Sequence, residues 1–397
     1  MLAERVNKIN ESPTMRVAME AKRMKAEGID VIDFSVGEPD FPTPDHIKKA
    51  AKTGIDDNHT RYTAIAGTAE LRKAVAQKLK QDNNLDYDIN EIIVTSGAKQ
   101  SVFNSLFAIV NKGEEVIIPS PYWVSYPDMV NMAEGISVFI ETDEKNGFRV
   151  TPEQLEKAIT PKTKALILCN PSNPTGSAYS KKELEDLANV CLKHNFYIIS
   201  DEIYEKLIYD NFEFISFASL SPEIKKRTLL VNGVSKSYSM TGWRIGYTAG
   251  PKEVISAMNK IQSHSTSHPS SVSQYAAIEA LSGSQSTVSE MITEYKKRRD
   301  YLYNQLVSIE GITCYKPEGT FFLFPNVSGL FGRKNDKMQI NNSLDLAMYL
   351  LNEGKIAVVP GTGFGAEGYL RISYATSMEN LKEASKRFKE TVGHLKP

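Results

Sequence analysis

A lysine and an arginine eight residues apart, Lys236 and Arg244, follow the apolar run TLLVNG. A lysine amine that is buried or close to another cation loses its proton readily and can attack a carbonyl carbon, and a guanidinium binds phosphate well. The pair therefore predicts Schiff-base chemistry beside a phosphate-binding group. Spacing alone leaves open that Lys236 is an ordinary solvated lysine.

Three further polar residues lie at or after the ends of apolar runs. Asp201 ends the run FYIIS, where its carboxylate could keep a cationic ring nitrogen protonated or could cap a helix. Tyr204 comes three residues later, on the same side of an expected helical turn, and Asn173 lies in the turn NPSNPTG. Each of the three could supply a hydrogen bond to a ligand, although an isolated residue of these types is more often structural.

Other positions suit the remaining parts of an anionic, planar ligand. Gly97 and Ala98 open an expected helix, whose free first-turn N–H groups can hold a phosphate. Trp123 follows a strand end, where it could stack on a ring or pack in the core. Arg371 lies in the run LRISYA on the face opposite Leu370, which favours a carboxylate ligand or an internal ion pair.

The elements that must position these residues alternate along the chain. Short apolar runs rich in β-branched residues are separated by amphipathic stretches, which predicts a mostly parallel seven-stranded sheet sandwiched by helices, an α/β fold. In such a sheet ligands bind at the carboxyl ends of the strands, where the candidate residues fall. The expected strands are EIIVT, EEVIIP, ISVFIET, KALILC, FYIIS, TLLVNG and WRIGYTAG.

A long charged helix over 285–309 is expected to connect this sheet to a smaller α+β unit. That unit contains strand-like GITCYK and TFFLFPN, a helix near 343–353, the strands KIAVVP and LRISYA, and a terminal helix from about 378. The predicted division is a large domain over 46–290 and a small domain formed by 1–45 and 291–397.

Composition excludes several classes of protein. The 397 residues are 41% hydrophobic and 24% charged, which is ordinary for a folded soluble protein, and the net charge of −1 argues against nucleic acid as the main partner. No window approaches the roughly 20 apolar residues of a membrane span. The three cysteines form neither a disulfide framework nor a Cys-x-x-Cys metal site. A cytoplasmic protein is expected.

Taken together, the motifs resemble the class I family of fold-type I pyridoxal-phosphate (PLP) aminotransferases, and most closely the bacterial aspartate aminotransferases. The similarity runs over nearly the whole chain. Its most specific segments are NPSNPTG, SDEIYE and SKSYSMTGWRIGY, and the others are GEPDFPTP, RYTAIAGTAELR, SGAKQ, PYWVSYP and LRISYA.

The resemblance implies a role for each matched residue. Lys236 is similar to the lysine that forms a Schiff base with PLP, and Asp201 to the partner of the pyridine nitrogen. Tyr204 and Asn173 are similar to residues that hydrogen-bond the ring hydroxyl oxygen, and Trp123 to one that stacks on the ring. Phosphate binding is implied for Arg244, Gly97 and Ala98, and substrate binding for Arg371 and Gly37. Many relatives carry a hydroxyl residue where this chain has Gly233, and Ser235 is the adjacent candidate.

The resemblance also implies partners and substrates. Tyr62 is similar to a tyrosine that reaches the phosphate from the partner subunit, which implies a homodimer with shared active sites. Lys99 is similar to a lysine associated with the distal carboxylate of an acidic substrate. Aspartate and 2-oxoglutarate are therefore expected as substrates, with another amino acid, or prephenate, as alternatives. A PLP-dependent lyase or synthase on the same fold, or a non-enzymatic regulator, are the other classes considered.

Overall fold

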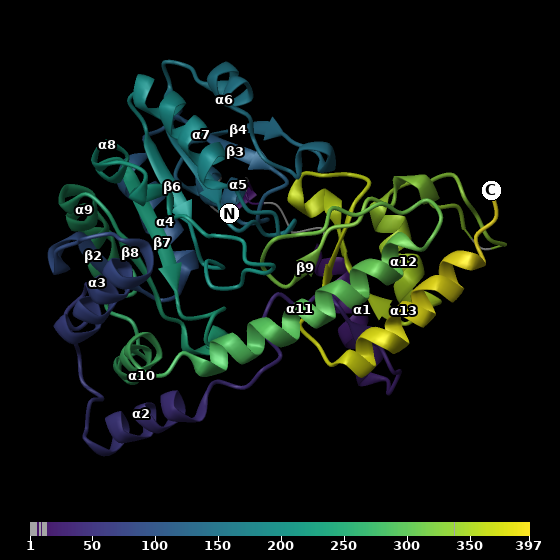
Figure 1. Cartoon of the computed structure of the whole chain (residues 1–397), viewed down its shortest axis with the longest axis horizontal. Coiled ribbons are helices and arrows are strands. Elements are labelled where there is room, and N and C mark those ends of the chain that lie inside the picture. The colour runs from purple at the N-terminus through teal and green to yellow at the C-terminus, as the bar shows by residue number, and fades with distance from the viewer. Residues whose placement is uncertain (1–5, 8, 10–13, 337) are drawn as a thin grey trace.

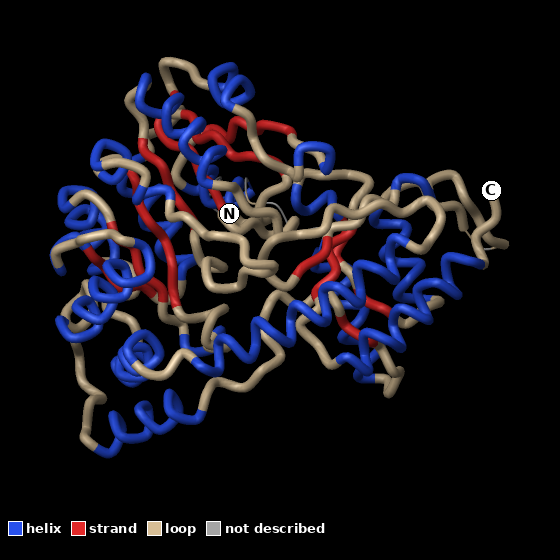
Figure 2. The backbone as a smooth tube through the Cα atoms, viewed as in Figure 1, coloured by secondary structure: helices blue, strands red, loops and turns tan. Residues whose placement is uncertain are grey.

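The computed structural model describes residues 6–7, 9, 14–336 and 338–397. Its main feature is a seven-stranded sheet with helices on both faces (Figures 1 and 2). From one edge to the other the strands are β2 (Ile92–Thr95), β8 (Gly246–Ala249), β7 (Thr228–Gly233), β6 (Tyr197–Asp201), β5 (Thr163–Cys169), β3 (Glu115–Ser120) and β4 (Ile136–Glu141).

The sheet is mostly parallel, as predicted. Strands β7, β6, β5, β3 and β4 pair in parallel, and β8 pairs antiparallel with both β2 and β7. The parallel strands therefore end at one common edge, and the segments that leave β3, β5, β6 and β7 begin next to one another there.

Alternate side chains of each strand pack on opposite faces of the sheet. In β3, Val116 and Ile118 join the same core cluster as Leu106, whereas Ile117 joins the cluster that contains Leu184. Both faces are therefore apolar, which explains why the strands read as nearly continuous hydrophobic runs. The helices of this part of the chain are α3 (Ala69–Asn83), α4 (Ala98–Ile109), α5 (Tyr126–Met132), α6 (Pro152–Ala158), α7 (Lys181–Lys193), α8 (Pro222–Lys225), α9 (Lys252–Ser263) and α10 (Ser271–Ser282).

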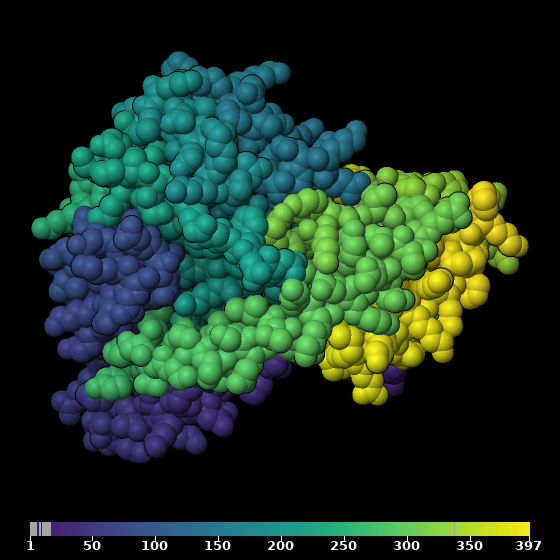
Figure 3. All heavy atoms as spheres, in the orientation of Figure 1, coloured from purple at the N-terminus to yellow at the C-terminus, as the bar shows by residue number. Residues whose placement is uncertain are grey.

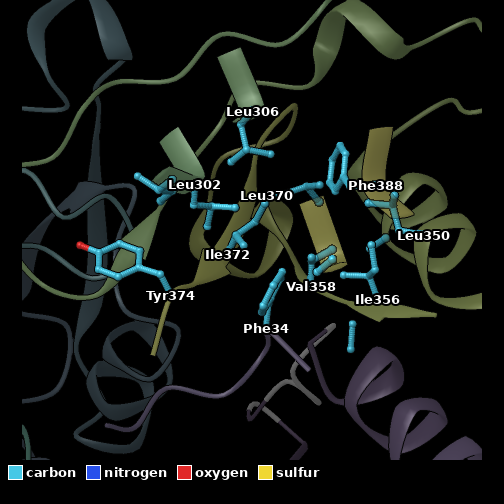
Figure 4. Close-up of a cluster of buried hydrophobic side chains, with 14 of the residues drawn as sticks. Phe34, Leu302, Leu306, Leu350, Ile356, Val358, Leu370, Ile372, Tyr374 and Phe388 are labelled. Atoms are coloured by element: carbon cyan, nitrogen blue, oxygen red, sulfur yellow. The ribbon is translucent and has the colours of Figure 1, made fainter. Parts of the chain in front are cut away.

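A second core lies at the far end of helix α11 (Ser286–Val307), which Figure 1 shows running from the part that contains the sheet to the C-terminal part of the chain. In Figure 3 the atoms of this region form a green band across the visible face. Figure 4 shows this core, where Phe34 from the N-terminal segment packs with Leu302, Leu350, Ile372 and Phe388. The elements around it are α1 (Thr14–Ala26), β1 (Ile32–Asp33), β9 (Phe322–Leu323), α12 (Ser343–Asn352), β10 (Ile356–Ala357), β11 (Val359–Pro360), β12 (Leu370–Ser373) and α13 (Met378–Gly393); α2 (Asp45–Asp56) packs on α10 instead.

The N- and C-terminal segments are joined directly by parallel pairing of β1 with β10, in which Ile32 faces Ile356. Helix α11 begins at Ser286, inside the range predicted for the large domain, and continues into the second core. The domain boundaries at 45/46 and 290/291 stay a prediction.

Two local expectations were wrong. The run GITCYK is not a strand, because only Thr313 pairs across, in an isolated bridge with Asn326. The residues after Asp201 form a turn over 203–206 rather than a helical turn. A β-rich run forms a strand only where a neighbour pairs along it, and GITCYK has only this bridge among the described residues. After Asp201, the N–H groups of Glu205 and Leu207 donate to the oxygens of Glu202 and Tyr204, which are the i→i+3 bonds of turns.

None of the described helices combines the length and apolar character needed to cross a membrane. Cys169, Cys191 and Cys314 are free thiols.

Candidate active site

A cavity of about 350 Å³ lies at the carboxyl edge of the sheet and is large enough for a cofactor-sized ligand. It brings together eleven of the thirteen residues singled out from the sequence: Gly37, Ala98, Lys99, Trp123, Asn173, Asp201, Tyr204, Ser235, Lys236, Arg244 and Arg371. The parallel strands explain the gathering, because Trp123, Asn173, Asp201 and Lys236 leave β3, β5, β6 and β7 at the same edge.

Lys236 lies half-buried among these residues. Its Nζ donates a hydrogen bond to the backbone oxygen of Gly37 at 2.5 Å. Burial, and next the positive charge of Arg371, lower the pKa of Lys236 to about 8. An appreciable fraction of the amine is therefore neutral near pH 7, as a nucleophile or proton acceptor requires.

Asp201 lies fully buried at the end of β6 and is held by Tyr126. The Tyr126 hydroxyl donates to Oδ2 at 2.7 Å, and the Ile203 N–H donates to Oδ1 at 3.3 Å. Burial raises the pKa of Asp201 to about 6, and the Tyr126 hydrogen bond opposes that rise by favouring the carboxylate. Asp201 therefore presents an oriented carboxylate near pH 7, the form that pairs with a protonated ring nitrogen.

Removing the Tyr126 hydroxyl should raise the pKa of Asp201 further. We expect Tyr126→Phe to shift it upward by about one unit, the loss of one hydrogen bond to a charged group. A raised pKa means that the carboxylate is lost at a higher pH as acid is added. PLP binding, measured as Kd against pH, should then weaken from a higher pH than in the wild type. Tyr349→Phe, which removes a buried hydroxyl bonded to Thr391 O, is the control that should leave this profile unchanged.

Arg371 projects from β12 into the cavity as a buried cation. Its Nη1 donates to Asn173 Oδ1 at 3.1 Å and its Nη2 to Ser35 O at 2.8 Å, while its Nε has no partner among the described residues. No described carboxylate forms an ion pair with it, so the internal ion pair considered from the sequence is absent from the part of the chain that the structure describes. Burial lowers the pKa of Arg371 to about 10, which still leaves it charged near pH 7.

A cation that is buried without an acid is costly unless a ligand supplies the negative charge. The planar guanidinium matches a carboxylate in a two-point fork. Arg371 is therefore built to receive an anionic ligand, and the cavity sets it beside Lys236, whose pKa it perturbs.

The start of α4 forms a cradle with Arg244. A Cβ atom on Gly97, whose φ is +83°, would lie 2.4 Å from Arg244 Nη2, so only glycine admits the guanidinium at this place. A Cβ on Gly246 would lie 2.3 Å from the backbone nitrogen of Ala98, so β8 can approach the helix start only as glycine. Helix α4 has no side-chain cap, which leaves first-turn N–H groups free beside a guanidinium, as a phosphate requires.

The other predicted residues have distinct surroundings. Tyr204 is buried, and burial raises the pKa of its hydroxyl. Lys99 lies with its Nζ 4.8 Å from the Trp123 ring centre, and burial followed by Arg244 lowers its pKa. Ser235 lines the cavity. At Gly233 a Cβ would lie 2.8 Å from Ile245 O, so this backbone has no room for the hydroxyl residue of many relatives.

Two predicted residues do not line the cavity. Gly97 lies just behind it, against Arg244. Tyr62 is 94% exposed, its ring lies against that of His268, and it is not among the cavity residues, so this chain does not place it in its own cavity.

The sequence reasoning missed five cavity residues: Val124, Tyr126, Cys169, Ile203 and Thr241. Tyr126 matters most, because it holds Asp201 across 75 residues of chain. Its only sequence signal was its place three residues after Trp123. Thr241 donates to Glu38 Oε2 at 2.7 Å and so connects the loop after Lys236 to the N-terminal segment.

The cavity brings together an oriented acid, a half-buried amine, a phosphate cradle and an arginine without a described acidic partner. These groups suit an enzyme that uses a phosphorylated ring cofactor on a carboxylate substrate. Residues 29–388 match the family model for aminotransferase class I and II. The chain belongs to this family of PLP-dependent aminotransferases.

The sequence is similar to curated relatives over all or nearly all of its length. The chain is 50% identical to a probable aspartate/prephenate aminotransferase of Rickettsia bellii over all of both chains, and 49% identical to an aspartate aminotransferase of Geobacillus stearothermophilus over 97% of each. Among solved structures, the Rhizobium meliloti aspartate aminotransferase has a TM-score of 0.97 at 45% identity and 100% coverage of both chains. The Thermus thermophilus enzyme with maleate has a TM-score of 0.93 at 42% identity, covering 98% of this chain and 99% of that one.

Proposed function

We propose that this aminotransferase moves the amino group of L-aspartate to 2-oxoglutarate and forms oxaloacetate and L-glutamate. The observation that carries the proposal is Arg371, a buried cation with no acidic partner among the described residues, which lies in the cavity that also contains Lys236. All four compounds carry the α-carboxylate that this guanidinium would bind.

The cavity residues divide the work of such a reaction. Arg244 and the Ala98 N–H at the start of α4 would hold the PLP phosphate, and Trp123 would stack on the ring. The Gly97 N–H already donates to Thr95 O at 2.8 Å, so Gly97 would serve by making room for the guanidinium. Asn173 and Tyr204 would hydrogen-bond the ring hydroxyl oxygen. Bound PLP supplies an electron sink that acidifies the substrate Cα–H bond.

Two residues would govern proton positions. Asp201 would keep the ring nitrogen protonated, because its buried carboxylate stabilises the adjacent positive charge. The Lys236 amine, with its lowered pKa, would bind the cofactor between turnovers. During turnover it would accept the proton from the substrate α-carbon and deliver it to the aldehyde carbon of the cofactor. Arg371 and Gly37 would orient the α-carboxylate so that the Cα–H bond faces this amine.

Lys99 supports an acidic substrate. Its Nζ lies over the Trp123 ring, and Lys99 lines the cavity. No described carboxylate forms an ion pair with it, so the distal carboxylate of a substrate can approach it. The Thermus thermophilus relative is described with maleate, a dicarboxylate, which fits this preference. The relatives described as aspartate/prephenate aminotransferases favour prephenate, which also carries two carboxylates, as a second candidate substrate.

Substrate preference tests Lys99 directly. We expect the wild type to show a higher kcat/KM for aspartate than for alanine or phenylalanine. Lys99→Met, which keeps the length and removes the charge, should lower the aspartate-to-alanine ratio by about tenfold to about a hundredfold, the value of a charged hydrogen bond. A wild-type preference for either neutral amino acid, or an unchanged ratio in the variant, would refute the assignment. Prephenate, a 2-oxo acid, should be compared with 2-oxoglutarate as the amino acceptor, with aspartate as the donor in both assays; the higher kcat/KM decides between these two acceptors.

A homodimer with shared sites is the proposed assembly. Tyr62 lies on an exposed segment outside its own cavity, where it is free to complete the phosphate site of a second copy. We expect Tyr62→Ala to weaken PLP binding. In a hybrid dimer of one Tyr62→Ala chain and one Lys236→Ala chain, one active site would contain the intact Lys236 of the first chain and the intact Tyr62 of the second, so activity should return at that site. Light scattering that reports a monomer, or hybrids no more active than their parents, would contradict shared sites. Reduced thiols favour a cytoplasmic location for this assembly.

A further inference from the structure

Two buried glutamates flank Tyr204 on the side away from the cavity. Residues 201–205 read DEIYE, and Asp201, Ile203 and Tyr204 line the cavity whereas Glu202 and Glu205 do not. Glu202 is 1% exposed and Glu205 is 7% exposed. Carboxylates at such depth require specific partners, so their contacts show what this segment is attached to.

Glu202 attaches the segment to the short helix Phe217–Ser219. Its Oε1 accepts hydrogen bonds from the hydroxyls of Ser200 and Ser216, both at 2.8 Å, and from the N–H of Phe217 at 3.1 Å. Its other oxygen has no partner among the described residues. Burial, and then the nearby Glu205, raise the pKa of Glu202 to about 8, so the side chain is a mostly neutral acid near pH 7.

Glu205 attaches the same segment to α3. Its carboxylate forms an ion pair with Lys78 and accepts from Asn83 Nδ2 at 2.9 Å, and Lys78 Nζ donates to Asn83 Oδ1 at 2.7 Å. All three side chains are buried. The two attachments are linked, because the Glu205 N–H donates to the backbone oxygen of Glu202 at 2.9 Å.

These contacts do more for geometry than for stability. A buried ion pair is often no more stabilising than apolar residues of the same volume, because desolvation offsets the attraction. Its directional hydrogen bonds nevertheless restrict where the backbone can lie. The segment needs such restraint, since it forms a turn after β6 and has no helix or strand of its own beyond Asp201.

We propose that Glu202 and Glu205 are positioning residues for the aminotransferase: anchored to Phe217–Ser219 and to α3, they hold the turn so that Asp201 and Tyr204 meet the PLP ring. This inference rests on the proposed roles of Asp201 and Tyr204. Neither glutamate lines the cavity, so their effect must pass through the direction of those two side chains.

The test separates positioning from folding. Lys78→Met/Glu205→Gln removes both charges of the buried pair, and Glu202→Leu removes the accepting oxygen that Glu202→Gln retains. We expect the double variant and Glu202→Leu to raise the Kd for PLP in the cofactor-free protein about tenfold, equivalent to losing one hydrogen bond, and to shift the pH titration of the bound cofactor's absorbance. Glu202→Gln should restore both towards the wild type.

An ion pair between buried Arg299 and exposed Asp210 provides the control. Arg299→Met/Asp210→Asn removes a buried arginine and its 2.5 Å partner outside the cavity, so it should lower Tm without altering PLP binding or the titration. If a variant of the anchors does not fold, Ser200→Ala/Ser216→Ala removes two donors to Glu202 without changing charge and is expected to shift PLP binding in the same direction.

The outcomes are distinct. Loss of PLP affinity with a shifted titration supports positioning. Variants that lose Tm but bind and titrate as the control does would overturn it, while leaving the proposed function intact. A wild type that neither binds PLP nor transfers an amino group would instead overturn the proposed function on which the inference depends.

Discussion

Lys236→Ala should abolish amino transfer, with kcat falling by about 10⁴-fold or more because the variant loses the positioned general base. No other described amine can replace it, since Lys99 lies against Trp123 and the remaining lysines do not line the cavity. The variant should still bind PLP without a covalent bond, because Arg244, Trp123 and Asp201 are intact.

Two measurements check this expectation. Borohydride reduction of PLP-loaded wild type should leave a cofactor adduct on the peptide containing Lys236, and the variant should show none. Lys182→Ala is the matched control, because this exposed lysine pairs with Asp186 on the surface of α7 and should keep the wild-type rate. Turnover near the wild-type value in Lys236→Ala would contradict the assigned role.

Arg371→Leu should lower kcat/KM for aspartate by about a thousandfold, or about 4 kcal/mol, because the α-carboxylate of the substrate would lose the buried guanidinium that binds it. Arg371→Lys should recover only part of this loss, since an ammonium is a point charge without the two-point fork. The steady-state constants for aspartate and for 2-oxoglutarate should change together, as both carry the same α-carboxylate.

Stability provides an independent check on Arg371. Because the guanidinium is buried without a described acid, removing it should maintain or raise the Tm of the cofactor-free protein. An amine that lacks the α-carboxylate should react with wild type and Arg371→Leu at similar rates. A large loss with that amine, or a sharp fall in Tm, would show that the arginine acts on the fold and not on the substrate.

Several features of the site could be predicted from local sequence. The strands β5, β6 and β7 are short apolar runs. Asp201 ends β6, and Asn173 and Lys236 lie in the segments that follow β5 and β7, so a parallel sheet must gather them at one edge. The glycine of SGAKQ likewise marked a helix start that could hold phosphate, and the structure places Arg244 against it.

Other features depended on contacts between distant segments. Tyr126 and Asp201 are 75 residues apart, and Arg371 and Asn173 are 198 apart, so no periodic pattern could pair them. The GITCYK error has a similar origin, since a β-rich run forms a strand only where a neighbouring segment offers hydrogen bonds. The outward position of Tyr62 was also invisible locally, because exposure is a property of the packed chain.

Residue order thus established which groups stand at the strand ends, since hydrophobic periodicity and turn chemistry are local. Packing then selected among their possible uses. It left Arg371 buried without a described acid, lowered the pKa of Lys236 through burial, and set Tyr126 against Asp201. Solvation and charge pairing act through space, so the chemistry of these side chains became readable only when the distant segments were seen together.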